Sequence, residues 1–417
     1  MVKLLCQGKM NKFKIILFSI FFIICKQSFA QVITLDSVLI LIEKNNPMLK
    51  MYDEQINAAN NNAQGAKSWM APSISTGPWQ TPYKNFNEGM WMITAEQMIP
   101  NPKKQRSNFD YIKGMSNVEL QGKNVKKNEL FAMAKLLYSN WIVSKKKYVI
   151  LQETDSLLNY LVKVANIRYT YNKEKLNNIY KAQAELFQLR NMETMIFSDM
   201  EMIKIELRTL MSLDKNSSIE LDTLLVPKYY ELQFSDTTLI STSRSDVKQF
   251  KESIGLIRMQ QQYEKSKRLP DFGISLSHMQ SLGEMPNSYS AMGMITIPIA
   301  PWASKEYKSN IKGLDNAANA IIFEEQALIN ESTGKILSLQ TQIKSSKILI
   351  SNYDNNILPA YLNSYHTTLI AYEQNTEDLF VVLDGLKMYW MAKIESLDQL
   401  FNLLKLQTEY EKELEIR

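Results

Sequence analysis

One stretch of this sequence decides its architecture because it occurs twice: Tyr169-x-x-Asn172-x-x-x-Leu176 returns 203 positions later as Tyr372-x-x-Asn375-x-x-x-Leu379. A second pair of segments is found in the same order. It consists of Ile112-Lys113-Gly114-Met115 and Ile311-Lys312-Gly313-Leu314, which lie 199 positions apart. Two copies in the same order indicate one structural unit that is used twice. The chain is therefore expected to fold as a two-fold internal repeat.

We expect the first repeat over residues 31–213 and the second over residues 244–417, joined by a connector over residues 214–243. Each repeat is predicted to contain a helix, a β-hairpin and a very long helical hairpin. The composition supports a mainly helical chain, since it has only 13 glycines and 12 prolines in 417 residues. The fold class is thus mainly α with some β structure.

The long helices are the most unusual prediction. From Lys103 to Tyr171 there is no proline, and 69 helical residues would be about 100 Å long. The second copy, Ser304 to Tyr372, has Pro359 as its one interior breaker. Near the amino terminus a shorter helix opens at Leu35 and should break at Asn45-Asn46-Pro47.

A β-hairpin is expected in front of each long helix, at about 70–99 and about 270–299. Phe272, Ile274 and Leu276 alternate with small or polar residues, which is the period of a strand, and a second strand is expected from Tyr289 to Ile299. Each strand is near the 9 to 11 residues of a transmembrane β-strand. On the strands alone, ordinary hairpins packed on a soluble core fit equally well.

The turns of the two helical hairpins are expected at Asn172 and Asn375. Asparagine tolerates the left-handed backbone conformation that commonly ends a helix, where glycine is more usual. New helices should then begin at Leu176 and Leu379.

The first 30 residues are typical of a signal peptide. Lys12 and Lys14 precede an apolar run, and Ser28-Phe29-Ala30 gives a cleavage site. Ile24 disfavours lipidation at Cys25, because a small residue is wanted there. Five leader lysines account for the excess of 48 basic over 43 acidic residues, so bulk charge gives no reason to expect binding to nucleic acid.

No catalytic motif is present, and neither an enzyme nor a cofactor is expected. The only histidines are His278 and His366, without a metalloprotease pattern around them. Methionine is the compositional oddity, with 22 residues. Thioethers suit soft ions such as Cu(I), whereas packing is the simpler role for methionine. The weak metal candidates are Met92, Met98, Met292 and Met294.

Two hairpins supply four strands, which cannot close a barrel alone. In lipid an open sheet edge leaves backbone N–H and C=O groups without hydrogen bonds, and each such group costs several kcal/mol. If the hairpins enter a membrane, several chains must therefore pool their strands. Three chains would supply twelve strands, together with long helices that form a tunnel.

The chain resembles the TolC family of bacterial outer-membrane efflux and secretion channels. The resemblance lies in Leu35 to Pro47, in Leu269-Pro270-Asp271-Phe272, in Ile297-Pro298-Ile299 and in Tyr372 to Asp384. The resemblance covers essentially all of residues 31–417. Within the family, the second hairpin looks closer to the CusC-like branch, whose members export heavy metals. The chain departs from the family by having asparagine instead of glycine at the tips.

This resemblance implies a homotrimer in the outer membrane, with a twelve-stranded barrel that continues into a helical periplasmic tunnel. It also implies docking of the tips, at Asn172, Leu176, Asn375 and Leu379, onto a periplasmic adaptor (a membrane fusion protein) that leads to an inner-membrane pump. The expected function is passive export of heavy-metal ions or drugs. A periplasmic helical adaptor or scaffold and a type I secretion channel stay as alternatives. The sequence identifies neither the cargo nor the gating residues.

Overall fold

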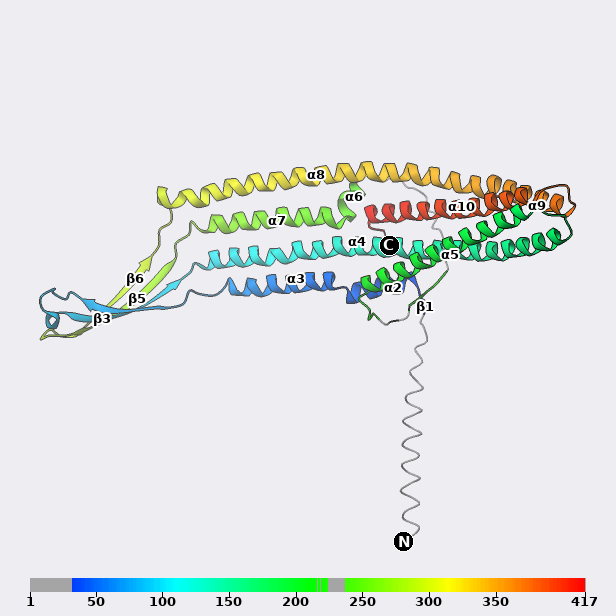
Figure 1. Ribbon diagram of the computed structural model, residues 1–417. Helices are drawn as coiled ribbons and strands as arrows, with labels where there is room; N and C mark the ends of the chain where they lie inside the picture. The colour runs from blue at the N-terminus through cyan, green and yellow to red at the C-terminus, as the bar shows by residue number, and fades with distance from the viewer. Residues whose placement is uncertain (1–31, 216, 218, 224–236, 417) are drawn as a thin grey trace, which may run out of the picture. The chain divides into compact units, whose positions relative to one another are not determined.

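The computed structural model describes residues 32–215, 217, 219–223 and 237–416 (Figure 1). The predicted signal peptide, residues 1–30, and much of the predicted connector lie outside the described residues. The chain divides into two compact units. The helical unit comprises residues 32–44, the described residues between 134 and 223, and Leu358–Asp398. The sheet unit comprises Asn45–Met133, residues 237–357 and residues 399–416.

The first helical segment breaks where the sequence predicts. Helix α2 spans Leu35–Asn45 and α3 spans Pro47–Gly65. Asn46 separates them, and its side-chain oxygen accepts a hydrogen bond from the Met48 N–H at 3.0 Å. Asn46 is thus the N-cap of α3, while Pro47 takes the first helical position, where its missing N–H costs nothing.

Both long helices begin at a proline, but only one of them is uninterrupted. Helix α4 spans Pro102–Thr170 and is 69 residues long. Helix α8 spans Pro301–Asn352, and a π-helical turn, η2 at Tyr353–Ile357, separates it from α9 at Leu358–Glu373. The turn has a local cause, because Pro359 has no N–H to donate four residues back and its ring crowds that carbonyl.

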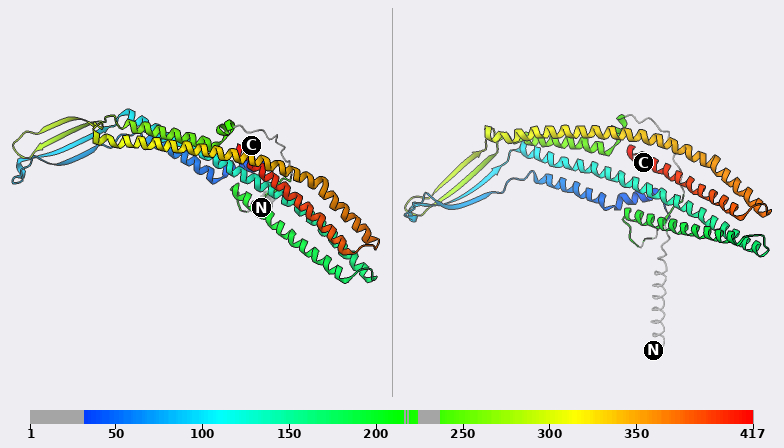
Figure 2. Two further views of the ribbon diagram at one scale, coloured as in Figure 1. Left: turned by 90° about the horizontal axis from the view of Figure 1, so that it is seen from above. Right: turned by 45° about the horizontal axis from the view of Figure 1, so that its top comes forward.

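The helical unit contains two helical hairpins whose turns lie side by side (Figure 2). Helix α5 (Leu176–Leu210) reverses the direction of α4, and α10 (Leu379–Leu414) reverses that of α9. Their facing sides form one apolar core. Its largest fully buried members are Leu151, Leu161, Leu189 and Tyr372. The hairpins therefore associate through leucine-rich seams, as long helices with apolar stripes do.

A second core lies in the sheet unit, where α8, α6 (Thr237–Ser243) and the end of α10 meet. Ile240, Ile336 and Ile343 are fully buried there. Helix α7 (Ser245–Ser266) begins beside the same helix end, and Arg244 in front of it forms a buried ion pair with Glu413. This ion pair joins the end of α10 to the start of α7.

The four predicted strands form one antiparallel sheet in the order β2-β3-β5-β6. Their bounds are Ser73–Trp79, Met90–Ile99, Phe272–Ser281 and Ser288–Ile295. Strands β3 and β5 form the central pair, with Thr94 opposite Ser277, so the two hairpins join in one sheet (Figure 1). The last strand ends at Ile295 and not at Ile299, because Pro298 cannot donate to a strand ladder.

The two faces of this sheet differ sharply in exposure. On one face, Ile74, Ile274 and Leu276 are 75%, 51% and 56% exposed. On the other, Ser275 and Ser277 are 1% and 7% exposed. A hairpin packed on a soluble core would bury its apolar side chains and expose the serines. The observed sheet does the opposite.

Of the predicted connector, two short elements are described. Strand β4 (Glu220–Leu221) pairs in parallel with β1 (Val32–Ile33), and α6 leads to Arg244. Helices α5 and α10 end alike: Ser212 and Glu415 both have a φ of 52°, and they lie 203 positions apart. The same displacement relates the sequence copies at the tips, so the duplication includes the helix ends.

Candidate functional site

The two hairpin turns are built alike. Asn172 and Asn375 have φ values of 57° and 62°, the left-handed conformation that the sequence predicts. The N–H of Lys173 donates to the Arg168 carbonyl at 2.9 Å, and the N–H of Thr376 donates to the Ala371 carbonyl at 2.9 Å. These bonds, from the residue after each left-handed asparagine back to the last turn of the helix, define a Schellman cap in both copies.

Arg168 connects the two turns. One guanidinium nitrogen donates to the Tyr372 carbonyl at 3.0 Å, and the other donates to the Asn375 side chain. The guanidinium also lies 4.2 Å from the centroid of the Tyr372 ring. The cation–π contact and two charge-assisted hydrogen bonds therefore fasten the end of α4 to the end of α9.

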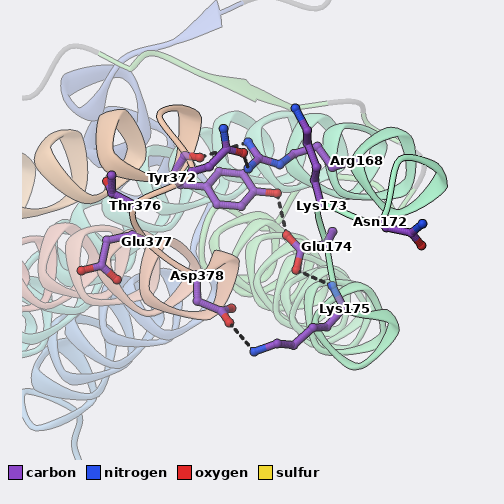
Figure 3. Close-up of a pocket in the computed structure, with 10 residues that line it drawn as sticks. Arg168, Asn172, Lys173, Glu174, Lys175, Tyr372, Thr376, Glu377 and Asp378 are labelled. Carbon is purple, nitrogen blue, oxygen red and sulfur yellow. Dashed lines mark hydrogen bonds and ion pairs between the residues drawn. The ribbon is translucent and has the colours of Figure 1, made fainter.

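A second set of contacts joins the same two turns (Figure 3). The Tyr372 hydroxyl donates to Glu174 at 2.8 Å, and Glu174 accepts from the Asn178 amide at 2.8 Å. Asn178 also donates to Asp378 at 2.5 Å, and Lys175 forms an ion pair with Asp378 at 3.3 Å. Each turn thus contributes donors and acceptors to the other. We call the residues of this network (Arg168, Glu174, Lys175, Asn178, Tyr372, Asn375 and Asp378) the tip network.

Two pKa shifts follow from this geometry. Burial and the hydrogen bond to Glu174 raise the pKa of Tyr372, so its hydroxyl stays a donor. The Phe380 N–H is the main cause of a lowered pKa for Asp378, partial burial opposes it, and Lys175 and Asn178 lower it further. Asp378 is therefore held as a carboxylate.

The tip network surrounds an open cavity of about 380 Å³ lined almost wholly by polar side chains. The exposed Asn172 and Asn375 are among the residues that line it. The arrangement is suited to holding the two hairpins together.

The two predicted tip leucines differ in their exposure to solvent. Leu176 is 42% exposed, whereas Leu379 is 0% exposed and belongs to the apolar core of the helical unit. Leu379 is therefore not accessible to a partner, although the sequence repeat suggested equal positions. The reason is register: Leu379 begins α10 facing the inner seam, while Leu176 begins α5 on its outer side.

Sequence reasoning did not identify Arg168, Glu174 or Asp378. A signal for two of them was available, because Glu174 corresponds to Glu377 at a displacement of 203 positions and Asp378 corresponds to Lys175. Arg168 had no such signal, because the corresponding residue is Ala371. The repeat pattern gave the turns but not the partners across them.

The four weak metal candidates lie together on one face of the sheet. Strand register places Met92 opposite Met279, and it places Met98 and Met294 on either side of Gly273. Met292 faces Ser275 on the same side. Among the described residues, no group of three or more His, Cys, Asp or Glu side chains is arranged to hold a metal ion.

No helix within the described ranges has the length and apolar character needed to cross a lipid bilayer.

No protein-family model and no curated protein sequence matches the chain. Solved structures do match. CmeC, an outer-membrane channel of Campylobacter jejuni, has a TM-score of 0.74 and 14% identity over 91% of this chain and 85% of its own. VceC, an outer-membrane protein of Vibrio cholerae, has a TM-score of 0.73 and 12% identity over 91% and 95%. CusC, whose structures concern transmembrane channel formation, has a TM-score of 0.74 and 11% identity over 93% of each chain.

The chain has the fold of the TolC-family outer-membrane channels. This confirms the predicted fold class in its helical part and its four-stranded antiparallel sheet. The heavy-metal branch is not singled out, since CusC matches no better than CmeC does.

Proposed function

We propose that this chain is the outer-membrane channel of a tripartite efflux system, a passive conduit without enzymatic chemistry or a cofactor. The observation that carries the proposal is the sheet: the isoleucine, leucine and phenylalanine side chains of one face are exposed, and serines of the other face are covered. An exposed face of isoleucine, leucine and phenylalanine is stable against lipid and unfavourable against water. The channel fold supports the same function.

The sheet edges favour a trimer. Strands β2 and β6 each have one unpaired edge in the single chain. Within hydrocarbon such an edge must be paired, and copies of the same chain offer matching edges. Three copies complete twelve strands, an even number in the range of bacterial barrels. The proposed assembly is a homotrimeric barrel that continues into a helical tunnel.

Helix α5 supports association between copies in the helical unit as well. An exposed stripe runs along it, formed by Leu176, Tyr180, Phe187, Met195, Met202 and Ile205. Their spacing keeps them within one narrow side of a helix. The residues between them on that side, such as Ala184, Asn191 and Ser198, carry no charge. An uncharged stripe of this length fits a neighbouring helix better than water.

The proposal places the sheet in outer-membrane lipid and the helices in the periplasm. The tips would contact a periplasmic adaptor that leads to an inner-membrane pump, through Asn172, Asn375 and the exposed Leu176. The two repeats, residues 31–213 and 244–417, would each supply one hairpin of the sheet and one helical hairpin, with residues 214–243 as connector. Nucleic acid has no role in this function.

Planar-bilayer recording of the purified protein tests the proposal. Stable ion conductance, together with a heat-dissociable trimer in outer-membrane fractions, is the expected result. Release of the protein as a soluble monomer in periplasmic extracts would overturn it and favour the periplasmic scaffold. Insertion without conductance would also contradict a conduit.

A further inference from the structure

One face of the sheet is unusually rich in sulfur. Six methionines lie on it, contributed by three of the four strands: Met90, Met92, Met98, Met279, Met292 and Met294. Most other side chains on this face are small, as Ser275, Ser277 and Thr94 are. We call it the thioether face. It is the face opposite the exposed isoleucines, so in the proposed channel it would line the interior.

Two of these thioethers converge over a glycine. Gly273 of β5 lies between Met98 of β3 and Met294 of β6 in the strand register. A Cβ atom at position 273 would lie 2.7 Å from the Met98 sulfur and 3.1 Å from the terminal methyl group of Met294. Both side chains therefore lean into the space that the glycine leaves open, and a larger residue would displace them.

The surroundings supply a third thioether and one negative charge. Met292 precedes Met294 by two residues on β6, so it lies on the same face one pleat along. Glu96 precedes Met98 by two residues on β3 and accepts a hydrogen bond from the Ser275 hydroxyl at 3.4 Å. A carboxylate at this position offsets the charge of a monovalent cation.

At the other end of the face, thioethers also act as acceptors. The Ser288 hydroxyl lies 3.5 Å from the Met279 sulfur and 3.9 Å from the Met90 sulfur. Two sulfurs thus approach one hydroxyl there. Thioether groups of neighbouring strands are close at both ends of the sheet.

Thioethers are neutral, soft ligands that select Cu(I) and disfavour hard ions such as Mg²⁺. They need no deprotonation, so binding does not compete with protons as it does at cysteine or histidine. We propose that Met98, Met292 and Met294 form a binding site for a soft monovalent metal ion, Ag(I) or Cu(I), over Gly273. The remaining methionines of the thioether face give weaker positions further along the sheet.

Partly exposed sulfurs favour a weak, exchangeable site. Met292 is 54% exposed in the single chain. A conduit needs sites that bind well enough to admit an ion and weakly enough to release it. The use of the site for passing ions rests on the proposed function, whereas the binding itself does not.

Titration of the purified full-length protein with silver nitrate, in detergent and without chloride, tests the site. Isothermal calorimetry measures the affinity, and silver K-edge absorption reports sulfur in the coordination shell. The double variant M98L/M294L keeps side-chain volume and removes two sulfurs. We expect its strongest binding phase to weaken by about tenfold to a hundredfold, since loss of even an outer-shell partner has effects of that order.

Two further variants separate ligation from packing. Gly273→Ala removes no sulfur but fills the space between the two thioethers, and it should also weaken binding. Met259→Leu is the matched control. The Met259 sulfur likewise lies 2.7 Å from a Cβ placed at a glycine, Gly114, but its other neighbour there is Leu256. This control should bind silver as the parent protein does.

Unchanged silver affinity in M98L/M294L, or silver bound without sulfur neighbours, would overturn the site. Equal weakening in the Met259→Leu control would do so too. Failure of the proposed function is seen separately: a protein that binds silver through these methionines but never conducts would refute the channel and leave the site. A protein that conducts but shows no methionine-dependent binding would refute the site alone.

Discussion

The guanidinium of Arg168 lies 4.2 Å from the centroid of the Tyr372 ring and donates to the Tyr372 carbonyl at 3.0 Å. These residues belong to different repeats, so this contact fastens one helical hairpin to the other. The Tyr372 hydroxyl adds a further contact between the repeats by donating a hydrogen bond to Glu174. In the proposed channel, such a connection would oppose the separation of the tips.

Arg168→Ala should therefore favour separated tips. A hydrogen bond to a charged group contributes about 1.5–3 kcal/mol, which corresponds to roughly a ten- to hundredfold change in the ratio of joined to separated tips. Planar-bilayer recording should show a higher mean conductance. The control is Arg190→Ala, because Arg190 pairs with Asp155 at 2.8 Å within one hairpin. Equal effects of both substitutions would contradict the role of Arg168.

Acid should loosen the same network. The pKa of Asp378 is lowered, so its contribution is present above the ordinary aspartate pKa of about 3.9 and is lost as the pH falls through the lowered value. The pKa of Tyr372 is raised, so its contribution is lost only as the pH rises through that raised value. Conductance should be flat between these limits and should rise on the acid side.

Asp378→Asn separates this cause from others. It removes the titrating carboxylate and keeps an oxygen that accepts the Phe380 N–H, whose distance to Asp378 is 3.1 Å. The variant should lose most of the acid-induced rise in conductance. An unchanged acid response would show that Asp378 does not control it.

The two tip leucines should respond differently to a negative charge. Leu379→Asp places a carboxylate in the apolar core, and the lost packing alone costs about 2–5 kcal/mol. Leu176→Asp changes a residue that is 42% exposed and should leave the fold intact. Thermal unfolding monitored by circular dichroism should show a lower midpoint for Leu379→Asp only. Export in cells should fall for both, through unfolding in one and impaired docking in the other.

The fold was largely readable from the sequence, because the duplicated segments, the change of period and the long stretches without a helix breaker are visible in the sequence itself. The long helix predicted from Lys103 begins at Pro102, and Asn172 and Asn375 adopt the predicted left-handed turn. The tip network was not readable in the same way. Arg168 meets Tyr372 across 204 residues, and no local pattern encodes which side of α4 faces α9. The burial of Leu379 was missed for the same reason.

The pair formed by Arg244 and Glu413 should dominate the stability of the sheet unit. Their side chains are 10% and 8% exposed, and Lys335 also binds Glu413, at 2.7 Å. Burial alone would raise the pKa of Glu413, but hydrogen bonds from Lys335 and Arg244 lower it below its ordinary value. Glu413→Gln removes the carboxylate that pairs with Lys335 and leaves Arg244 with Asp246, at 2.6 Å, as its counter-charge, so it should cost about 1.5–3 kcal/mol.

Denaturant or thermal unfolding in detergent measures this loss. Because the Glu413 pKa is lowered, stability should also fall in the parent protein as the pH drops from about 4.3 through the lowered value. That acid dependence should be reduced in Glu413→Gln. Lys126→Gln is a suitable control, since its partner Glu129 is largely exposed and surface pairs contribute little.

The exposed stripe on α5 offers the most direct test of oligomerisation. Phe187 and Met202 are 59% and 52% exposed on one side of the helix, while Leu186 and Ile203 beside them face the core of the same unit. F187E/M202E should leave the single chain folded, because neither side chain packs inside it. It should prevent the association of copies, since charges at the centre of a helix seam lose their water without a partner.

Native mass spectrometry or light scattering in detergent gives the oligomeric state of this variant, and circular dichroism gives its helicity. The expected result is a helical monomer where the parent is a trimer. Phe197→Glu is the matched control, because Phe197 is 52% exposed on another side of α5. A variant trimer as stable as the parent would show that the stripe faces something other than a second copy, and the strand edges alone would then have to account for assembly.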